Sequence, residues 1–233
     1  MVELNQIVLG DCLQVMKDIP DNYFELAIVD PPYGGGGKEF KGTDGRFGGW
    51  FEKYRQGVSL TTPEIEMTRT GGTWASKYSN KISEWDVAPP QEYFEELFRV
   101  SQNQIVWGGN YFMLPPTRCF LVWKKLTISE NFSMAMCEYA WTSFNDNAKL
   151  FEYAPQDKDR FHPTQKPLAL YEWVISRYAK EGDKILDTHS GSGTCCVAAY
   201  NLGHEFLGIE IDEFYHKKSV ERLENVKAQM RLF

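Results

Sequence analysis

Four consecutive segments between residues 184 and 210 constrain the fold more than any other part of the chain. The apolar run 184–187 precedes a glycine-rich turn, 188–194, which leads into the apolar stretch 195–200. A second apolar run, 204–210, follows and ends in an acid. Strand, glycine turn, helix and strand in this order are typical of a βαβ unit in an open α/β sheet.

The glycine turn is a candidate cofactor site. Gly191 and Gly193 let the backbone approach a ligand closely, and the following helix begins with N–H groups that suit a carboxylate or phosphate. No Gly-Lys-Ser/Thr follows, and the spacing does not fit the dinucleotide fingerprint, which disfavours a P-loop and a nucleotide-dependent dehydrogenase. A carboxylate-bearing cofactor is expected, with Glu210 placed to bind two ribose hydroxyls.

A second motif, Asp30-Pro31-Pro32-Tyr33, follows the apolar run 25–29 and so lies at the carboxyl end of a predicted strand. The prolines stiffen the turn, so the Asp30 carboxylate and the Pro31 carbonyl can face one small planar amine together. The Tyr33 ring offers that group a stacking surface. An ordinary strand-ending turn is the other interpretation, and the glycine turn further along favours the functional one.

Together these motifs resemble S-adenosylmethionine-dependent DNA amino-methyltransferases of the β group, in which the catalytic motif precedes the cofactor motif. The resemblance covers nearly the whole chain. It implies a permuted, Rossmann-like α/β fold: a seven-stranded mixed sheet, the last strand reversed, with helices on both faces. It also implies S-adenosylmethionine as cofactor and duplex DNA as partner, with the target base flipped out of the helix.

The resemblance assigns the site residues as well. Asp11 would contact the adenine of the cofactor, and the segment 162–167 would wrap its methionine end. The catalytic group comprises Asp30, Pro31, Pro32 and Tyr33, and the cofactor-binding group comprises Asp11, Thr164, Gln165, Lys166, Asp187, Gly191, Ser192, Gly193, Thr194 and Glu210.

The chain departs from the family pattern at one place. The family usually has Asp-Pro-Phe before its Gly-Ser-Gly-Thr, whereas this chain has Asp187-Thr188-His189-Ser190. The missing phenylalanine removes apolar packing expected beside the sulfonium. We expect His189 to be a solvated turn residue rather than a replacement for that ring.

Composition limits the remaining possibilities. A length of 233 residues suits one domain, 1–233, and no apolar stretch is long enough to span a membrane. The N-terminus lacks a basic-then-apolar signal, so a cytoplasmic enzyme is expected. Five cysteines form no C-x-x-C pair and have no metal-ligand spacing with the four histidines, which predicts neither a metal site nor a disulfide.

The segment 34–86 is a basic and aromatic insertion in an acidic chain of net charge −7. Between Lys38 and Lys81 eight basic residues stand against five acidic ones. The glycine run that opens it indicates a loop that closes over substrate, and the other interpretation is a disordered insertion. Its candidate DNA-binding residues are Lys38, Lys41, Arg46, Lys53, Arg55 and Tyr78.

Periodicity predicts the other elements. Helices are expected at 12–18, 91–100, 168–178 and 213–229, and strands at 6–9 and 104–107. Two more, 119–125 and 138–142, are expected to form an antiparallel edge. The segment 144–161 is predicted to be a loop in the position of the family's target-recognition region, yet it is far shorter than that region. Recognition would then rely partly on the insertion or a partner, or be lax.

Three questions stay open at this point. By resemblance, aspartate rather than serine at the first motif position favours N6 of adenine as the target, with N4 of cytosine as the alternative. A non-catalytic cofactor-binding or DNA-binding module is the alternative of another class, if the altered turn no longer holds the cofactor. Whether the protein forms a homodimer or pairs with a cognate restriction nuclease is not determined by any motif.

Overall fold

The computed structural model describes residues 2–33, 87–130, 135–155 and 160–230. The insertion 34–86 lies outside these ranges, and with it the six candidate DNA-binding residues, Lys38, Lys41, Arg46, Lys53, Arg55 and Tyr78. The elements are, in chain order, β1 (Gln6–Leu9), α1 (Cys12–Lys17), β2 (Phe24–Val29), α4 (Gln91–Val100), β3 (Ser101–Trp107), the 3₁₀ turn η1 (Gly109–Tyr111), β4 (Phe120–Lys125), β5 (Cys137–Thr142), β6 (Lys149–Tyr153), α5 (Leu168–Tyr178), β7 (Ile185–Asp187), α6 (Thr194–Asn201), β8 (Phe206–Glu210) and α7 (Glu213–Met230).

Eight strands form one mixed sheet in the order β1-β8-β7-β2-β3-β5-β4-β6. Strand β5 pairs antiparallel with both β3 and β4, and the other described pairs are parallel. The predicted α/β mixed sheet is therefore confirmed. The count of seven strands is not, and the reversed strand lies inside the sheet rather than last in it.

The extra strand is β6, which falls in the segment 144–161 that was predicted to be a loop. That prediction is wrong for residues 149–153, which pair in parallel with β4. The strand lies at the edge of the sheet and is mostly exposed, so its side chains carry no clean alternation of apolar and polar residues. Tertiary contacts stabilise it instead: the Trp123 indole N–H donates to the Tyr153 carbonyl at 3.1 Å. The predicted antiparallel edge is correct as a pair, β4 with β5, but not as an edge.

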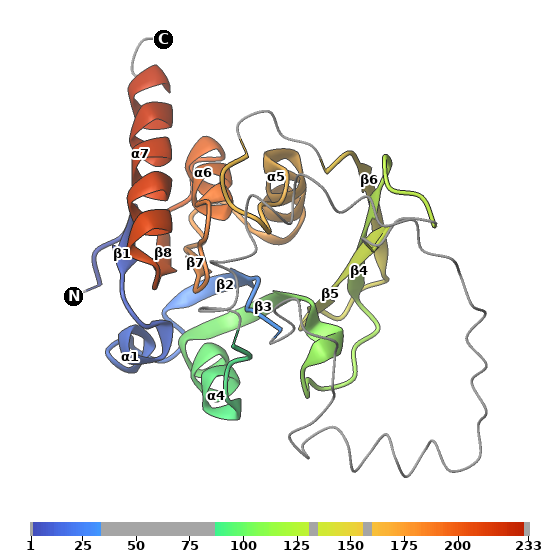
Figure 1. The fold of residues 1–233 in the computed structure, drawn as a ribbon. Helices are drawn as coiled ribbons and strands as arrows, with labels where there is room; N and C mark the ends of the chain where they lie inside the picture. The colour runs from blue at the N-terminus through green and yellow to red at the C-terminus, as the bar shows by residue number, and fades with distance from the viewer. Residues whose placement is uncertain (1, 34–86, 131–134, 156–159, 231–233) are drawn as a thin grey trace.

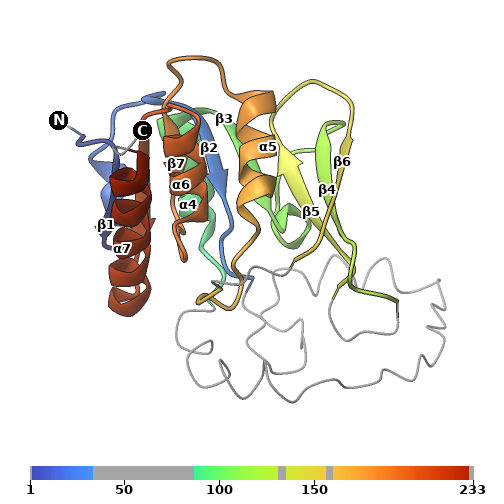
Figure 2. The same cartoon turned by 90° about the horizontal axis from the view of Figure 1, so that it is seen from above.

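Helices cover both faces of the sheet (Figure 1). Helices α5, α6 and α7 lie side by side on one face, as Figure 2 also shows, and α1 and α4 lie on the other. Alternate residues of the central strand β2 enter the two cores: Leu26 and Ile28 pack on the α5–α7 side, and Ala27 and Val29 on the α1–α4 side. Among the described residues, no helix has both the length and the apolar character that crossing a bilayer requires.

The sheet reverses its winding between β7 and β2. These strands are parallel neighbours, yet the next described helices, α6 after β7 and α4 after β2, lie on opposite faces of the sheet (Figure 1). Such a reversal opens a crevice beyond the carboxyl ends of the two strands, which is where open α/β sheets bind ligands. The predicted catalytic motif follows β2 and the predicted cofactor turn follows β7, so both border this crevice.

Candidate active site

Three of the predicted acidic residues lie at the carboxyl ends of adjacent strands. Asp187 ends β7, Glu210 ends β8, and Asp11 follows β1 as the N-cap of α1, where its Oδ1 accepts the Gln14 N–H at 3.1 Å. The β1–β8 register pairs Leu9 with Glu210, and the Gly10 N–H donates to the Glu210 carbonyl at 2.9 Å. The strand pairing therefore brings together groups that are about 200 residues apart in the sequence.

The glycine turn is held by Glu210. Its Oε2 accepts the Gly191 N–H at 2.6 Å, and its Oε1 accepts the Asp212 N–H at 2.9 Å. Gly191 has φ +50°, and a Cβ atom there would lie 3.1 Å from the buried His162 ring, so the turn needs glycine for both conformation and space. This close approach packs the loop before α5 directly against the turn.

The two hydroxyl residues of the turn bond within the protein. The Ser192 and Thr194 hydroxyls are 2.8 Å apart, and both residues are buried. Arg222 of α7 donates from Nη1 to the Thr194 hydroxyl at 2.8 Å and to the Ser192 carbonyl at 3.1 Å. Sequence reasoning missed Arg222, because one basic residue on an amphipathic helix carries no signal of what it contacts.

The segment 162–167 forms the loop that precedes α5. His162 is buried with its ring 4.3 Å from that of Tyr215, and its Nδ1 lies 3.1 Å from the Thr164 hydroxyl. Burial lowers the pKa of His162 to about 3, so its ring is neutral at physiological pH. Gln165 is buried and accepts the Phe161 N–H at 3.3 Å, whereas Thr164 is exposed.

Lys166 from the same loop reaches the catalytic motif. Its ammonium group contacts Oδ2 of Asp30, while the Tyr33 hydroxyl donates to Oδ1 at 3.1 Å. Burial raises the pKa of Asp30, and the Lys166 charge opposes that rise. The resemblance grouped Lys166 with the cofactor-binding residues, but the structure places its charged end on the carboxylate of Asp30.

The Tyr33 ring occupies a defined position next to η1. It stacks on Tyr111 with ring centroids 4.5 Å apart and an interplanar angle of 23°. The backbone of Gly108 lies under the same ring, and a Cβ atom there would come within 2.1 Å of Tyr33 Cε1. The sequence indicated only a glycine turn after a strand here. Neither the second ring nor the role of Gly108 in seating Tyr33 was predicted.

The expectation for His189 is wrong. The residue is half-buried, and its ring lies edge-on to that of Tyr93 of α4 at 5.2 Å. Its Nδ1 is 2.9 Å from the Thr188 hydroxyl, which is itself 2.6 Å from the Tyr93 hydroxyl, and its Nε2 is 3.8 Å from Cys12 Sγ. Helices α4 and α1 thus cover a turn that the sequence alone leaves open to solvent.

Because burial lowers the pKa of His189 to about 4, this residue makes folding depend on pH. The unfolded chain takes up a proton near pH 6.5 and the folded chain does not, so stability is fully present above that pH and is lost as pH falls toward 4. We expect His189→Phe to remove about 2 kcal/mol of the stability loss that wild type shows between pH 7 and pH 5. Urea unfolding at both pH values measures this, and parallel losses in the two proteins would contradict it.

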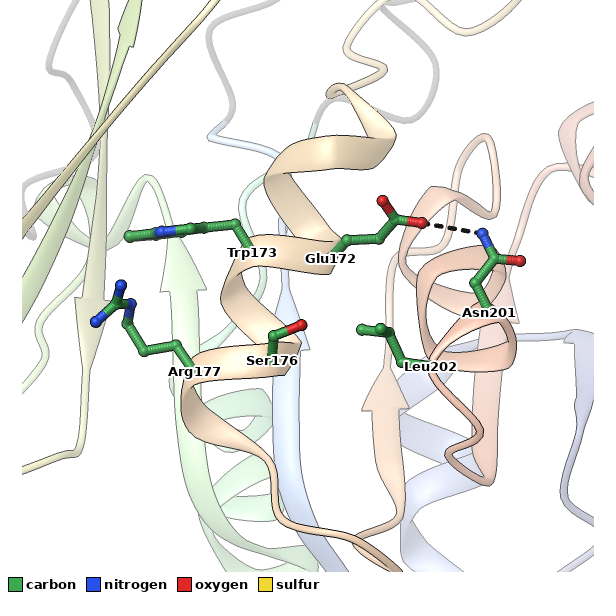
Figure 3. Close-up of a pocket in the computed structure, with 6 residues that line it drawn as sticks. All are labelled: Glu172, Trp173, Ser176, Arg177, Asn201 and Leu202. Atoms are coloured by element: carbon green, nitrogen blue, oxygen red, sulfur yellow. Dashed lines mark hydrogen bonds between the residues drawn. The ribbon is translucent and has the colours of Figure 1, made fainter.

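Within the described ranges, His, Cys, Asp and Glu side chains nowhere gather in threes in a way that could hold a metal ion. A pocket lies elsewhere, between the last turns of α5 and α6 (Figure 3), and none of the predicted site residues lines it. Its polar groups are partly satisfied internally, since Asn201 Nδ2 donates to Glu172 at 3.0 Å and the Arg177 guanidinium lies 5.2 Å from the centre of the Trp173 ring. The predicted acidic site residues therefore lie at the carboxyl ends of the strands and not at this pocket.

Comparisons with known proteins agree with this geometry. The model of a family described as DNA methylase matches residues 121–221. The type II methyltransferase M.HinfI of Haemophilus influenzae is 25% identical over 96% of this chain and 69% of its own length. The M1.HpyAVI–SAM complex superposes with a TM-score of 0.55 at 20% identity, covering 94% of this chain and 98% of that one.

The cytosine-N4-specific PvuII DNA methyltransferase superposes with a TM-score of 0.52 at 13% identity, covering 96% of this chain and 91% of that one. At such identities the structural likeness establishes a common fold. The sheet and its helices therefore share the fold of these solved structures.

Proposed function

We propose that this chain, whose residues 121–221 match the model of a family described as DNA methylase, transfers a methyl group from S-adenosylmethionine to N6 of adenine in duplex DNA. One observation carries the proposal. The motif Asp30-Pro31-Pro32-Tyr33 and the turn 188–194 follow β2 and β7, which are neighbouring parallel strands. A motif that would bind an amine and a turn that would bind a cofactor therefore lie beside each other at one end of the sheet, which supports the proposal.

The residues beyond β7, β8 and β1 fit S-adenosylmethionine. Helix α6 begins at Gly193 without a side-chain cap, which leaves its first N–H groups available to the carboxylate of an amino-acid moiety. Glu210 and Asp11 would accept hydrogen bonds from the ribose hydroxyls and the adenine amine, because a carboxylate oxygen that already accepts one backbone N–H keeps a second lone pair. When bound, the cofactor supplies an electrophilic methyl group on a cationic sulfur.

Asp30 and Pro31 would hold the target nitrogen. An exocyclic amine on a base is a poor nucleophile, because its lone pair is delocalised into the ring. Two N–H bonds, one to the Asp30 carboxylate and one to the Pro31 carbonyl, would favour tetrahedral geometry at nitrogen and free the lone pair. The nitrogen carries positive charge once methylated, which the Asp30 carboxylate stabilises, and it then loses a proton. Tyr33 would stack on the base.

Adenine is the proposed target because the motif begins with aspartate rather than serine, which in the resembling family favours N6. The second candidate is N4 of cytosine, since that base presents the same kind of planar amine to Asp30 and Pro31. Either amine lies within the base stack of duplex DNA, so the target nucleotide has to be flipped into the crevice. We propose that the insertion 34–86 contributes phosphate and base contacts through its basic and aromatic residues.

The test is a transfer assay with product identification. The protein is incubated with methyl-labelled S-adenosylmethionine and unmethylated duplex DNA, and the DNA is digested to nucleosides for mass spectrometry. Label in N6-methyladenine supports the proposal, and label in N4-methylcytosine keeps the reaction but changes the base. Cofactor binding without label in DNA would contradict methyl transfer to DNA. Absence of cofactor binding would favour a non-catalytic module.

A further inference from the structure

Four charged side chains of alternating sign form a connected row beside the catalytic motif: Asp30, Lys166, Glu138 and Lys125. We call this set the charge row. Lys166 contacts Asp30 Oδ2 and lies 3.1 Å from Glu138 Oε2, and Lys125 lies 2.6 Å from Glu138 Oε1. The four residues come from the turn after β2, the loop before α5, β5 and β4, so the row connects four separate parts of the fold.

The charge row is largely removed from solvent. The side chains of Lys166, Lys125 and Asp30 are 3%, 7% and 13% exposed, and that of Glu138 is 26% exposed. Desolvating so many charges is costly, and apolar residues of similar volume would usually stabilise the fold as well or better. Stability alone therefore gives a weak reason for the row. A stronger reason for the charge row is that the site needs Asp30 to be charged and held in one orientation.

The Lys166 ammonium group has few donors left for a ligand. It carries three N–H bonds, of which one is directed to Asp30 and one to Glu138. Its remaining side meets the face of the Trp107 ring, whose centre is 5.4 Å away. In this structure the ammonium group of Lys166 therefore contacts the two acids and the indole ring.

We propose that Lys166 and Glu138 are positioning residues for Asp30: Lys166 holds one carboxylate oxygen and keeps the group ionised, and Glu138, anchored by Lys125, fixes Lys166. The inference rests on the proposed methyl transfer, because it names what prepares Asp30 to accept the amine. Tyr33 holds the other oxygen, so the carboxylate is oriented from both sides.

The surroundings of Asp30 make it depend on Lys166. Its other titratable neighbours in the described structure are acids or phenols: Tyr33 on the same turn, Tyr93 on α4, Glu138 on β5, Tyr171 on α5 and Asp187 on β7. Burial alone would raise the pKa of Glu138 as well, but the ammonium groups of Lys166 and Lys125 outweigh it and bring that pKa down to about 2. Loss of Lys166 would leave the buried Asp30 with the Tyr33 hydrogen bond but without its cation, which favours protonation of the carboxylate.

The experiment compares Lys166→Met, Lys166→Arg and Glu138→Gln with wild type. We expect Lys166→Met to lower kcat about 100-fold at pH 7, with cofactor affinity in a calorimeter changed by less than about threefold. Lys166→Arg should restore part of kcat, since it keeps the charge. Glu138→Gln should lower kcat about tenfold. Adding it to Lys166→Met should lower kcat little further, because Glu138 acts through Lys166.

Lys124→Met is the control. Lys124 is next to Lys125 on β4, but it pairs with Glu152 at the surface, so its replacement should leave kcat unchanged.

Two further readouts distinguish positioning from a merely structural role. The acid limb of the kcat profile of Lys166→Met should move to higher pH by more than about one unit, because Asp30 must then ionise without its cation. At pH 7 the infrared spectrum of Lys166→Met should contain a protonated carboxyl band that wild type lacks. Adding Asp30→Asn to Lys166→Met should remove this band.

Cofactor affinity that falls in step with kcat would overturn the inference and make Lys166 a cofactor ligand. Unchanged kcat in Lys166→Met or Glu138→Gln would overturn it as well. If wild type itself transfers no label to DNA, the proposed function fails. The infrared comparison then still decides whether Lys166 keeps Asp30 ionised.

Discussion

Replacing Asp30 with alanine should lower methyl transfer to DNA by about a thousandfold or more, the largest effect that we expect from any single substitution. The carboxylate would take one of the two N–H bonds of the amine and stabilise the positive charge that develops on nitrogen. It is also the end of the charge row, so its removal leaves Lys166 facing an empty position. Steady-state kinetics with the labelled cofactor measures the loss in kcat.

Cofactor binding should survive this substitution, because Asp30 follows β2 while the proposed cofactor turn follows β7 and is fixed by Glu210. Calorimetry should give an affinity within about threefold of wild type. Asp21→Ala is the matched control, since Asp21 is an exposed acid that pairs with Arg99, precedes β2 at the end of the strand opposite Asp30, and should change neither quantity. Unchanged turnover in Asp30→Ala would remove Asp30 from the catalytic group.

Local signals predicted most of the helices well. Helices α4 and α5 have the predicted bounds, 91–100 and 168–178. Each helix begins directly after a proline, Pro90 or Pro167. Proline has no backbone N–H and is tolerated only at the start of a helix, so it marks where the helix begins. The apolar stripe of α4 was predicted to be core packing, and Tyr93, Phe94, Leu97 and Val100 are indeed buried. Periodicity was sufficient here because each helix has one buried face.

Contacts between distant segments were not predictable in the same way. Lys166 and Asp30 are 136 residues apart, and no spacing in the sequence connects them. The motif that contains Lys166 indicated only that this residue lies near the site. Which group Lys166 contacts depends on the three-dimensional path of the loop before α5. His189 failed for a related reason. A histidine in a glycine turn is usually solvated, but α4 places Tyr93 over this one.

The proposed catalytic motif depends on Gly108, a residue that has no reactive group. Gly108 adopts φ +65° beneath the Tyr33 ring, and the Gly108 N–H donates to the Tyr139 carbonyl at 2.8 Å, which fixes its backbone on β5. Any side chain at this position collides with Tyr33, because the first added carbon would lie 2.1 Å from the ring. The backbone is anchored, so we expect the ring to move instead.

We therefore expect Gly108→Ala to lower methyl transfer about 100-fold, since Tyr33 would lose both its stack on Tyr111 and its hydrogen bond to Asp30. The left-handed backbone would also lower the free energy of unfolding by about 1–2 kcal/mol. Gly182→Ala separates the two effects, because Gly182 has φ +87° with no atom within 4 Å of the added carbon. It should lose stability by a similar amount and keep full turnover. Equal turnover in the two variants would show that strain, and not the seat of Tyr33, is what Gly108 provides.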